Sequence, residues 1–222
     1  MKKALCVISG GMDSAVAAAI AKRDGYEILG LHFDYKQRTQ SRERQCFYDI
    51  CSDLGAKSFV FDASFIAGIG GSALTDLSLE VPKNRKELFE QAKKSEPPIT
   101  YVPFRNGIFL SIAVALAQKE GCEAVFLGLV EEDGSGYPDC SADFLAKMTA
   151  AIQSGTGTKT QLIAPLIAKN KGQIVKIGTE LGVDFSHTYS CYESDSKPCG
   201  ACDSCKLRAR GFAAAGIKDP VS

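Results

Sequence analysis

The sequence predicts an α/β fold, with an open parallel sheet of about five strands and helices on both faces. Strand-like apolar runs alternate with longer helix-like segments through most of the 222 residues. The strand-like runs are continuously apolar, which is typical of parallel strands buried on both faces. The first run ends in a glycine-rich turn from which a helix starts at once, as in a βαβ unit.

The predicted elements follow one another along the chain. Strands are expected at residues 4–8, 26–35, 57–62, 124–130 and 160–166. Helices are expected at residues 15–20, 39–54, 107–119 and 141–153, and from Lys171 onward. Residues 64–100 interrupt the alternation with glycines and a charged stretch. Loops of this length inside a domain are usually lids, binding loops or disordered segments, and we predict a lid there.

Composition and charge argue against several classes of function. Lys plus Arg and Asp plus Glu both number 26, so no bulk field attracts nucleic acid or an anionic membrane. No apolar run approaches the roughly 18 residues of a membrane-spanning helix, and the run after Lys2 and Lys3 is too short for a signal peptide. We therefore expect a cytoplasmic protein that acts on small molecules, without nucleic-acid or membrane partners. Closed dimers are the commonest soluble assembly, which makes a homodimer the default expectation.

The turn after the first strand carries a strong chemical signal. It reads Ser-Gly-Gly-Met-Asp-Ser at residues 9–14. Backbone N–H groups at a helix start, aided by the helix dipole, bind an anion where no side chain obstructs it. The Walker and Rossmann patterns are both absent, so this is a phosphate cradle of another type or a generic glycine-rich turn. The residues expected to hold a nucleotide are Ile8, Ser9, Gly10, Gly11, Met12, Asp13 and Ser14, with Asp34 and Tyr35 at the end of the second strand.

Two basic residues near later helix starts are candidate phosphate ligands. Arg105 follows Pro103, which stops any helix from running in, and its guanidinium presents paired donors to phosphate oxygens. Lys171 lies near the start of another predicted helix. With Asp13, they form the predicted catalytic set. The alternative for Arg105 is a surface salt bridge, and the alternative for Lys171 is an ordinary solvated lysine.

The loop after the fourth strand has the chemistry of a substrate-binding loop. A carboxylate beside an aromatic ring suits a purine-like base, because the acid accepts from its N–H groups while the ring stacks. A turn of solvated acids is the alternative. The predicted substrate contacts are Asp133, Ser135, Tyr137 and Asp139. Cys140 closes the loop, but the sequence shows no base to activate its thiol.

Four cysteines near the C-terminus have metal-ligand spacing. Seven residues separate Cys191 from Cys199, and two residues separate Cys199 from Cys202 and Cys202 from Cys205. Four thiolates close a tetrahedron around Zn²⁺, and a structural zinc site is predicted. A [4Fe–4S] cluster and the absence of metal are the alternatives. We divide the chain into an α/β domain at residues 1–185, which contains the glycine-rich turn, and a zinc-binding segment at residues 186–222.

The Ser-Gly-Gly-x-Asp-Ser turn resembles the pyrophosphate loop of the PP-loop ATP-pyrophosphatases, which split ATP into AMP and pyrophosphate. Three further blocks match one branch of that group: YVPFRN at residues 101–106, SGYPDC at 135–140 and the four-cysteine set. In this order, and over nearly the whole chain, they resemble the 7-cyano-7-deazaguanine synthase (QueC) family. Many relatives have Gln-Arg-His where this chain has Gln37-Arg38-Thr39, so no role is carried over for that histidine.

The resemblance implies a ligase with an adenine-nucleotide alpha-hydrolase-like fold. The family converts 7-carboxy-7-deazaguanine and ammonia into the nitrile for queuosine or archaeosine biosynthesis, turning two ATP into AMP and pyrophosphate. ATP, Mg²⁺ and a structural Zn²⁺ are the implied cofactors. Two other functions are compatible with the loop, namely a tRNA-sulfurating enzyme and a module that binds a nucleotide without catalysis.

Overall fold

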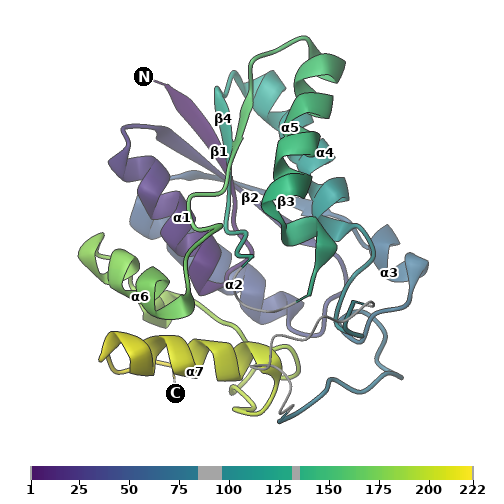
Figure 1. Ribbon diagram of the computed structural model, residues 1–222, viewed down its shortest axis with the longest axis vertical. Helices are drawn as coiled ribbons and strands as arrows, with labels where there is room; N and C mark the ends of the chain where they lie inside the picture. Colours follow the sequence, from purple (N-terminus) through teal and green to yellow (C-terminus); the bar gives the residue numbers. More distant parts are fainter. Residues whose placement is uncertain (1, 85–96, 132–135, 222) are drawn as a thin grey trace.

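A parallel sheet of five strands forms the centre of the molecule (Figure 1). The structure is a computed structural model that describes residues 2–84, 97–131 and 136–221. The strands are β1 (Lys3–Val7), β2 (Glu27–Asp34), β3 (Lys57–Asp62), β4 (Ala124–Leu127) and β5 (Gln161–Ile163). They lie in the order β3-β2-β1-β4-β5, and every neighbouring pair is parallel. The sequence prediction of an open parallel sheet is confirmed.

The strand order places a switch point at β1. The chain first builds outward from β1 through β2 to β3, and then returns to the other side of β1 for β4 and β5. In such sheets a crevice opens beyond the carboxyl ends of the strands on either side of the reversal. Val7 pairs in register with Leu31 of β2 and Leu127 of β4. β1 and β4 therefore end level with each other, and β2 continues past them to Asp34.

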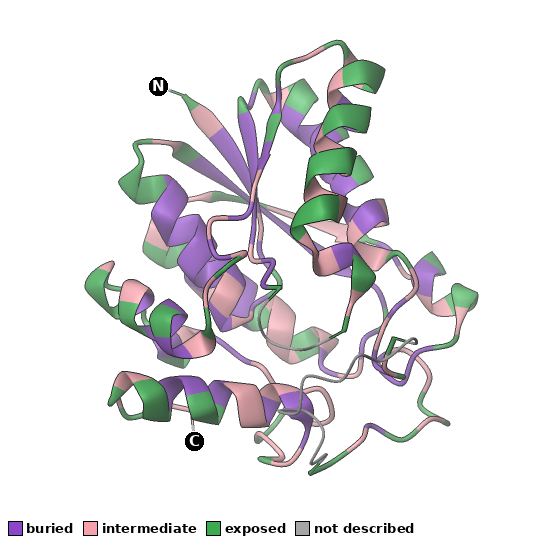
Figure 2. Ribbon diagram, in the orientation of Figure 1, coloured by how far each residue is buried: buried purple, intermediate pink, exposed green. Residues whose placement is uncertain are grey.

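Helices cover both faces of the sheet, as predicted (Figure 1). They are α1 (Met12–Arg23), α2 (Gln40–Leu54), α3 (Phe65–Ile69), α4 (Arg105–Glu120), α5 (Ala142–Thr156), α6 (Lys171–Glu180) and α7 (Asp203–Ala215). Alternate strand residues face opposite ways. Leu5 packs in the cluster that contains α4 and α5, whereas Ala4 and Cys6 pack in the cluster that contains α1 and α2. Figure 2 shows β1, β2 and β4 buried between these layers, while the edge strand β3 is intermediate or exposed.

The C-terminal part of the chain packs along the outer side of α1. Val16 of α1, Ile174 of α6 and Phe212 of α7 share one buried cluster. Arg208 is buried beside them, and its guanidinium donates to both carboxylate oxygens of Asp219, at 2.8 and 2.9 Å. This buried bidentate ion pair holds the chain end against α7.

A short turn before this segment is tied to α2. It is the 3-10 helix η3 (Phe185–His187), and its His187 Nδ1 lies 2.7 Å from Asp53 Oδ2 near the end of α2. The hydrogen bond that Asp53 accepts from the imidazole raises the pKa of His187 above its ordinary value. The imidazolium that links the two elements therefore persists to higher pH than in an isolated histidine.

Several predicted boundaries were wrong by a few residues. The strand predicted at 124–130 ends at Leu127, because a Cβ at Gly128 would lie 2.5 Å from the backbone nitrogen of Ser14. The strand predicted at 160–166 covers only Gln161–Ile163. The helix predicted at 15–20 already starts at Met12, directly after the glycines, and ends at Arg23.

Part of the predicted lid is held by Arg38. Its guanidinium donates to the carbonyl oxygens of Ala73 at 2.7 Å and Asp76 at 3.0 Å. Residues 85–96 lie outside the described residues, so the lid stays a prediction, as does the division into a domain and a C-terminal segment. No helix of the described ranges is long and apolar enough to span a membrane.

Replacing Gly128 by alanine is expected to destabilise the fold by about 1–3 kcal/mol, because the new methyl group would overlap the backbone of α1. Gly155→Ala in α5 is the matched control, because nothing lies within 4 Å of its added Cβ. That control should change stability by less than about 1 kcal/mol, in the stabilising direction. Urea unfolding of both variants measures the difference, and equal free energies of unfolding would contradict the proposed close contact.

His187 is expected to make stability depend on pH. Because its pKa is raised in the folded state, the contribution is fully present below the usual value of 6.5 and is lost as pH rises through the folded pKa. Urea unfolding between about pH 5 and 9 should therefore show the wild type losing its advantage over His187→Gln as pH rises. A difference that stays constant with pH would argue against the pair with Asp53. The Asp53→Asn variant should lower the His187 pKa in an NMR titration.

Candidate active site

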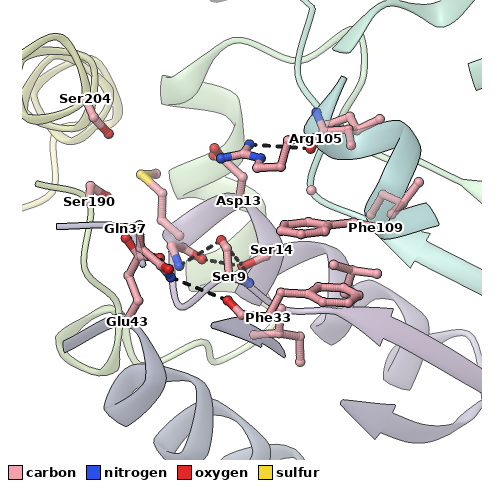
Figure 3. A pocket seen from close by; sticks show the side chains of 18 of the residues that line it. Ser9, Asp13, Ser14, Phe33, Gln37, Glu43, Arg105, Phe109, Ser190 and Ser204 are labelled. Carbon is pink, nitrogen blue, oxygen red and sulfur yellow. Dashed lines mark hydrogen bonds between the residues drawn. The ribbon is translucent and has the colours of Figure 1, made fainter. Parts of the chain in front are cut away.

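A cavity of about 270 Å³ opens at the carboxyl edge of the sheet, beyond the ends of β1, β2 and β4. It is lined by the turn after β1, the starts of α4 and α6, residues of α2 and residues of the C-terminal segment. Figure 3 shows side chains from these separate elements converging on it. This is the crevice that the strand order predicts.

The turn after β1 forms the floor of the cavity, and its own side chains fix its shape. Ser14 Oγ donates to the carbonyl oxygen of Gly11 at 2.9 Å and accepts from the backbone N–H of Ser9 at 3.2 Å. Gly10 has φ +87°, and a Cβ there would collide with the carbonyl oxygen of Glu43. The turn therefore brings the start of α1 to the cavity with little side-chain cover, as a phosphate cradle requires.

Asp13 and Lys171 meet at one wall of the cavity. Lys171 Nζ lies 2.6 Å from Asp13 Oδ2, and their side chains are 12% and 25% exposed. The second carboxylate oxygen of Asp13 is buried and accepts no hydrogen bond from the described residues. The site therefore combines a cation with a carboxylate oxygen that still has acceptor capacity.

Arg105 lies at another wall, at the start of α4 (Figure 3). Its Nη1 donates to the hydroxyl of Tyr35 at 3.0 Å, and its guanidinium lies over the rings of Tyr35 and Phe109. Burial alone would lower the pKa of Arg105. The effects of Tyr35, Cys140 and Asp139 are larger together, and they raise the pKa above its ordinary value. The guanidinium is therefore a fixed positive charge at the cavity.

Asp139 is held at the start of α4 and does not line the cavity. Its Oδ2 accepts from the backbone N–H of Asn106 at 3.0 Å, and its carbonyl oxygen accepts from Asn106 Nδ2 at 3.2 Å. Burial raises the pKa of the Asp139 carboxyl. The carboxylate thus satisfies the helix N-terminus and supports the position of Arg105. A direct substrate contact for Asp139 stays a prediction.

The remaining residues of the predicted substrate loop are placed differently. Tyr137 lines the cavity, and its hydroxyl lies 2.8 Å from Thr100 Oγ1. Cys140 also lines it, and burial raises the pKa of its thiol to about 12, as expected of an unreactive thiol. Asp133 and Ser135 lie outside the described residues.

Most of the predicted nucleotide contacts line the cavity. They are Ile8, Ser9, Gly11, Met12, Asp13, Ser14 and Tyr35, together with the predicted catalytic residues Arg105 and Lys171. Gly10 does not line the cavity, but its lack of a side chain lets the turn lie against the carbonyl of Glu43. Asp34 does not line the cavity, because its Oδ2 accepts from Arg44 Nη1 at 2.8 Å and its Oδ1 lies 3.6 Å from His32 Nε2.

Sequence reasoning missed two groups of cavity residues. The first group is Gln37 and Thr39, between β2 and α2, with Glu43 in the first turn of α2. The second group is Tyr189, Ser190 and Ser204 of the C-terminal segment. The polar residues directly after β2 were an available signal for the first group, because strand ends meet at this edge. No local sequence pattern indicated that the second group would line the cavity.

The four C-terminal cysteines converge as predicted. The sulfur atoms of Cys191, Cys199, Cys202 and Cys205 all lie within 4.8 Å of one another. Backbone N–H groups of Glu193 and Cys199 donate to Cys191 Sγ, both at 3.4 Å. Four convergent sulfurs, of which that of Cys191 accepts these backbone hydrogen bonds, form a metal-binding cluster.

The cluster is joined to the phosphate turn, as we call the turn after β1 at residues 9–14, through the nearby residue Tyr189. The backbone N–H of Tyr189 donates to the carbonyl oxygen of Gly10 at 2.9 Å. Cys191, Cys202 and Cys205 also share a buried cluster with Cys46 of α2. The cysteine site therefore supports the wall of the cavity formed by the C-terminal segment.

Comparison with known proteins assigns the chain to a family. The profile of the family described as "Queuosine biosynthesis protein QueC" matches residues 3–216. The chain belongs to the QueC family. A QueC relative from Campylobacter jejuni, named 7-cyano-7-deazaguanine synthase, is 55% identical over 99% of this chain and 97% of that protein. A relative of the same name from Campylobacter hominis is 56% identical, over 99% and 98%.

A more distant likeness concerns the fold of this QueC chain. The structure of a 4-thiouridine synthetase in complex with RNA and ATP aligns with a TM-score of 0.52 and 20% identity, over 97% of this chain and 53% of that one. At this identity the two proteins share a fold, and the likeness says nothing further of their substrates. The family assignment and the PP-loop fold agree with the sequence predictions.

Proposed function

We propose that the chain is a 7-cyano-7-deazaguanine synthase, a ligase that forms C–N bonds. It converts 7-carboxy-7-deazaguanine and ammonia into 7-cyano-7-deazaguanine, with two ATP converted to AMP and pyrophosphate. The observation that carries the proposal is the cavity itself, where the phosphate turn, Lys171 and Arg105 meet beyond the ends of β1 and β4. Family membership and relatives of this name at 55–56% identity support it.

The chemistry explains why such a site is needed. A carboxylate resists ammonia because its leaving group is poor. Attack of the acid on the α-phosphorus forms an acyl–phosphate bond, and pyrophosphate leaves with the electron pair of the broken P–O bond. The N–H groups of the turn, Ser9 and Ser14 bind the phosphates, and the charges of Lys171 and Arg105 stabilise the departing pyrophosphate.

Ammonia then displaces AMP and gives the amide. A second adenylation, now on the amide oxygen, allows AMP to leave as the nitrile forms. Tyr35 and Phe109 supply an aromatic wall for a base, and Tyr137, Asp133, Ser135 and Asp139 remain the candidates for deazapurine contacts. The queuosine pathway is the biological context that the family description supplies.

Asp13 is the residue that would hold Mg²⁺. Its buried Oδ1 has no hydrogen-bond donor among the described residues, and a carboxylate oxygen beside a phosphate cradle is the ligand that Mg²⁺ prefers. When bound, the ion would neutralise charge on the leaving pyrophosphate. Lys171, paired to the other oxygen, holds the carboxylate in place.

Zinc is the metal that suits the four cysteines. Four thiolates leave no open coordination position, so the site has a structural role and clamps the C-terminal segment onto the cavity. A cytoplasmic location and a homodimer stay predictions from the sequence.

The activity is tested by incubating the protein with Mg²⁺-ATP, ammonia and 7-carboxy-7-deazaguanine. Mass spectrometry should detect the nitrile, with two pyrophosphates released for each nitrile. Lys171→Met should lower kcat by about 10²–10³, because it removes a charge that stabilises the leaving group. The control is Lys147→Met, whose exposed lysine pairs with Asp143 on α5. Unchanged acid, or amide that accumulates without nitrile, would refute the assignment, and intact ATP would support a binding module.

Metal content provides a separate measurement. Elemental analysis should find about one zinc per chain, and Cys199→Ser should lose the metal and lower the melting temperature. Cys122→Ser is the matched control, because this buried thiol lies outside the cluster, and it should keep its zinc. Iron with a brown colour would instead indicate an iron–sulfur cluster.

A further inference from the structure

Glu43 of α2 has an unusual position beside the phosphate turn. Its side chain lines the cavity, and its backbone carbonyl lies against Gly10, where even a Cβ would not fit. The acyl–phosphate bond of the proposed reaction forms above this turn. In the proposed reaction, the carbon that forms the bond to nitrogen would therefore lie near Glu43.

Two neutral donors orient the carboxylate. Thr39 Oγ1 donates to Glu43 Oε1 at 2.6 Å, and Gln37 Nε2 donates to Glu43 Oε2 at 3.0 Å. Gln37 is itself fixed, because its Oε1 accepts from the backbone N–H of Tyr35 at 2.9 Å. Figure 3 shows Gln37 and Glu43 close together at the cavity. The arrangement holds both carboxylate oxygens in place and leaves each with further acceptor capacity.

Among the described residues, the Glu43 carboxylate is hydrogen-bonded but is not in an ion pair. In the part of the chain that the structure describes, no Lys, Arg or His forms an ion pair with Glu43, although Asp13 and Asp34 nearby have Lys171 and Arg44. A negative charge in a partly buried cavity is costly unless it is paired. The remaining acceptor capacity of the Glu43 carboxylate suits a small cation with several N–H donors.

Because the proposed reaction consumes ammonia, which is mostly ammonium at neutral pH, we propose that Glu43 binds the ammonium ion and takes its proton. This inference rests on the proposed function. The nitrogen lone pair released by deprotonation forms the C–N bond to the acyl carbon. The C–O bond to the phosphate breaks, and its electron pair leaves with AMP. The nitrogen then gives its second proton to water, which yields the neutral amide and regenerates the site once Glu43 releases its own proton.

The surrounding charges agree with a proton acceptor. Burial raises the pKa of Glu43, while the hydrogen bonds from Thr39 and Gln37 and the charge of Arg105 lower it. The other titratable groups near it are Asp34 and Tyr35 at the end of β2 and Cys46 on α2. A carboxylate with a raised pKa holds a proton better than an exposed one, which helps it to deprotonate ammonium.

Glu43→Gln tests the inference because the two halves of the reaction can be measured separately. Exchange of labelled pyrophosphate into ATP, with the acid present and ammonia absent, should stay within about twofold of wild type, because adenylation needs no ammonium. Amide and nitrile formation with ammonium should fall about 10²–10⁴-fold. The remaining rate should rise with pH as free ammonia becomes available. Hydroxylamine, which is mostly uncharged at neutral pH, should trap the adenylate equally well in both proteins.

Two further variants complete the test. Glu120→Gln changes an exposed ion pair with Lys57 and should leave both half-reactions unchanged. Thr39→Val removes the hydroxyl and keeps the shape, so it should raise the Glu43 pKa and move the pH profile of amide formation upward without affecting pyrophosphate exchange.

The results separate this inference from the proposed function. A wild-type protein that makes no nitrile refutes the function. With an active wild type, the inference is refuted if Glu43→Gln keeps the wild-type KM for ammonium and the wild-type rate. The inference is also refuted if the variant loses pyrophosphate exchange or has a higher KM for the acid, since Glu43 would then bind the deazapurine. Should Glu43→Gln fail to fold, an unchanged pH profile of Thr39→Val refutes the inference.

Discussion

Close contact between backbones around the turn after β1 is the constraint on which the site depends. Gly10 lies under the carbonyl of Glu43, Gly128 lies against Ser14, and the N–H of Tyr189 bonds to the carbonyl of Gly10. These contacts come from α2, the end of β4 and the C-terminal segment. The turn is therefore held on three sides by distant parts of the chain, so its anion-binding groups are arranged before any ligand arrives.

Much of the fold could be predicted from local pattern. Buried parallel strands, the glycine turn and the cysteine spacing each depend on residues close in sequence, and each was confirmed. Side-chain direction was harder. Asp34 and Tyr35 are neighbours at the end of β2, and alternation sends them to different sides. Tyr35 therefore lines the cavity, while Asp34 pairs with Arg44. Asp139 matched a substrate ligand in residue type, but the free N–H of Asn106 takes its carboxylate.

Residues whose position depends on tertiary contact could not be found in this way. Glu43 is one charged residue among several at the start of α2. Its position in the cavity follows only from the contact between that helix and the turn after β1. Thr39 directly precedes α2, and its hydroxyl supports the Glu43 carboxylate. The link between the cysteine cluster and the phosphate turn is equally long in sequence. It runs from Cys191 through Tyr189 to Gly10, a separation that no local pattern reveals.

That link has a consequence for biosynthesis of the protein on the ribosome. The sheet and the phosphate turn are encoded in the first 163 residues, and they can form while the rest is still being made. The wall that contains Tyr189, Ser190 and Ser204 is synthesised last, together with all four cysteines. A nascent chain of that length therefore lacks both the Tyr189 contact to the turn and one wall of the cavity. Completion of the cavity therefore coincides with synthesis of the four cysteines of the metal-binding cluster.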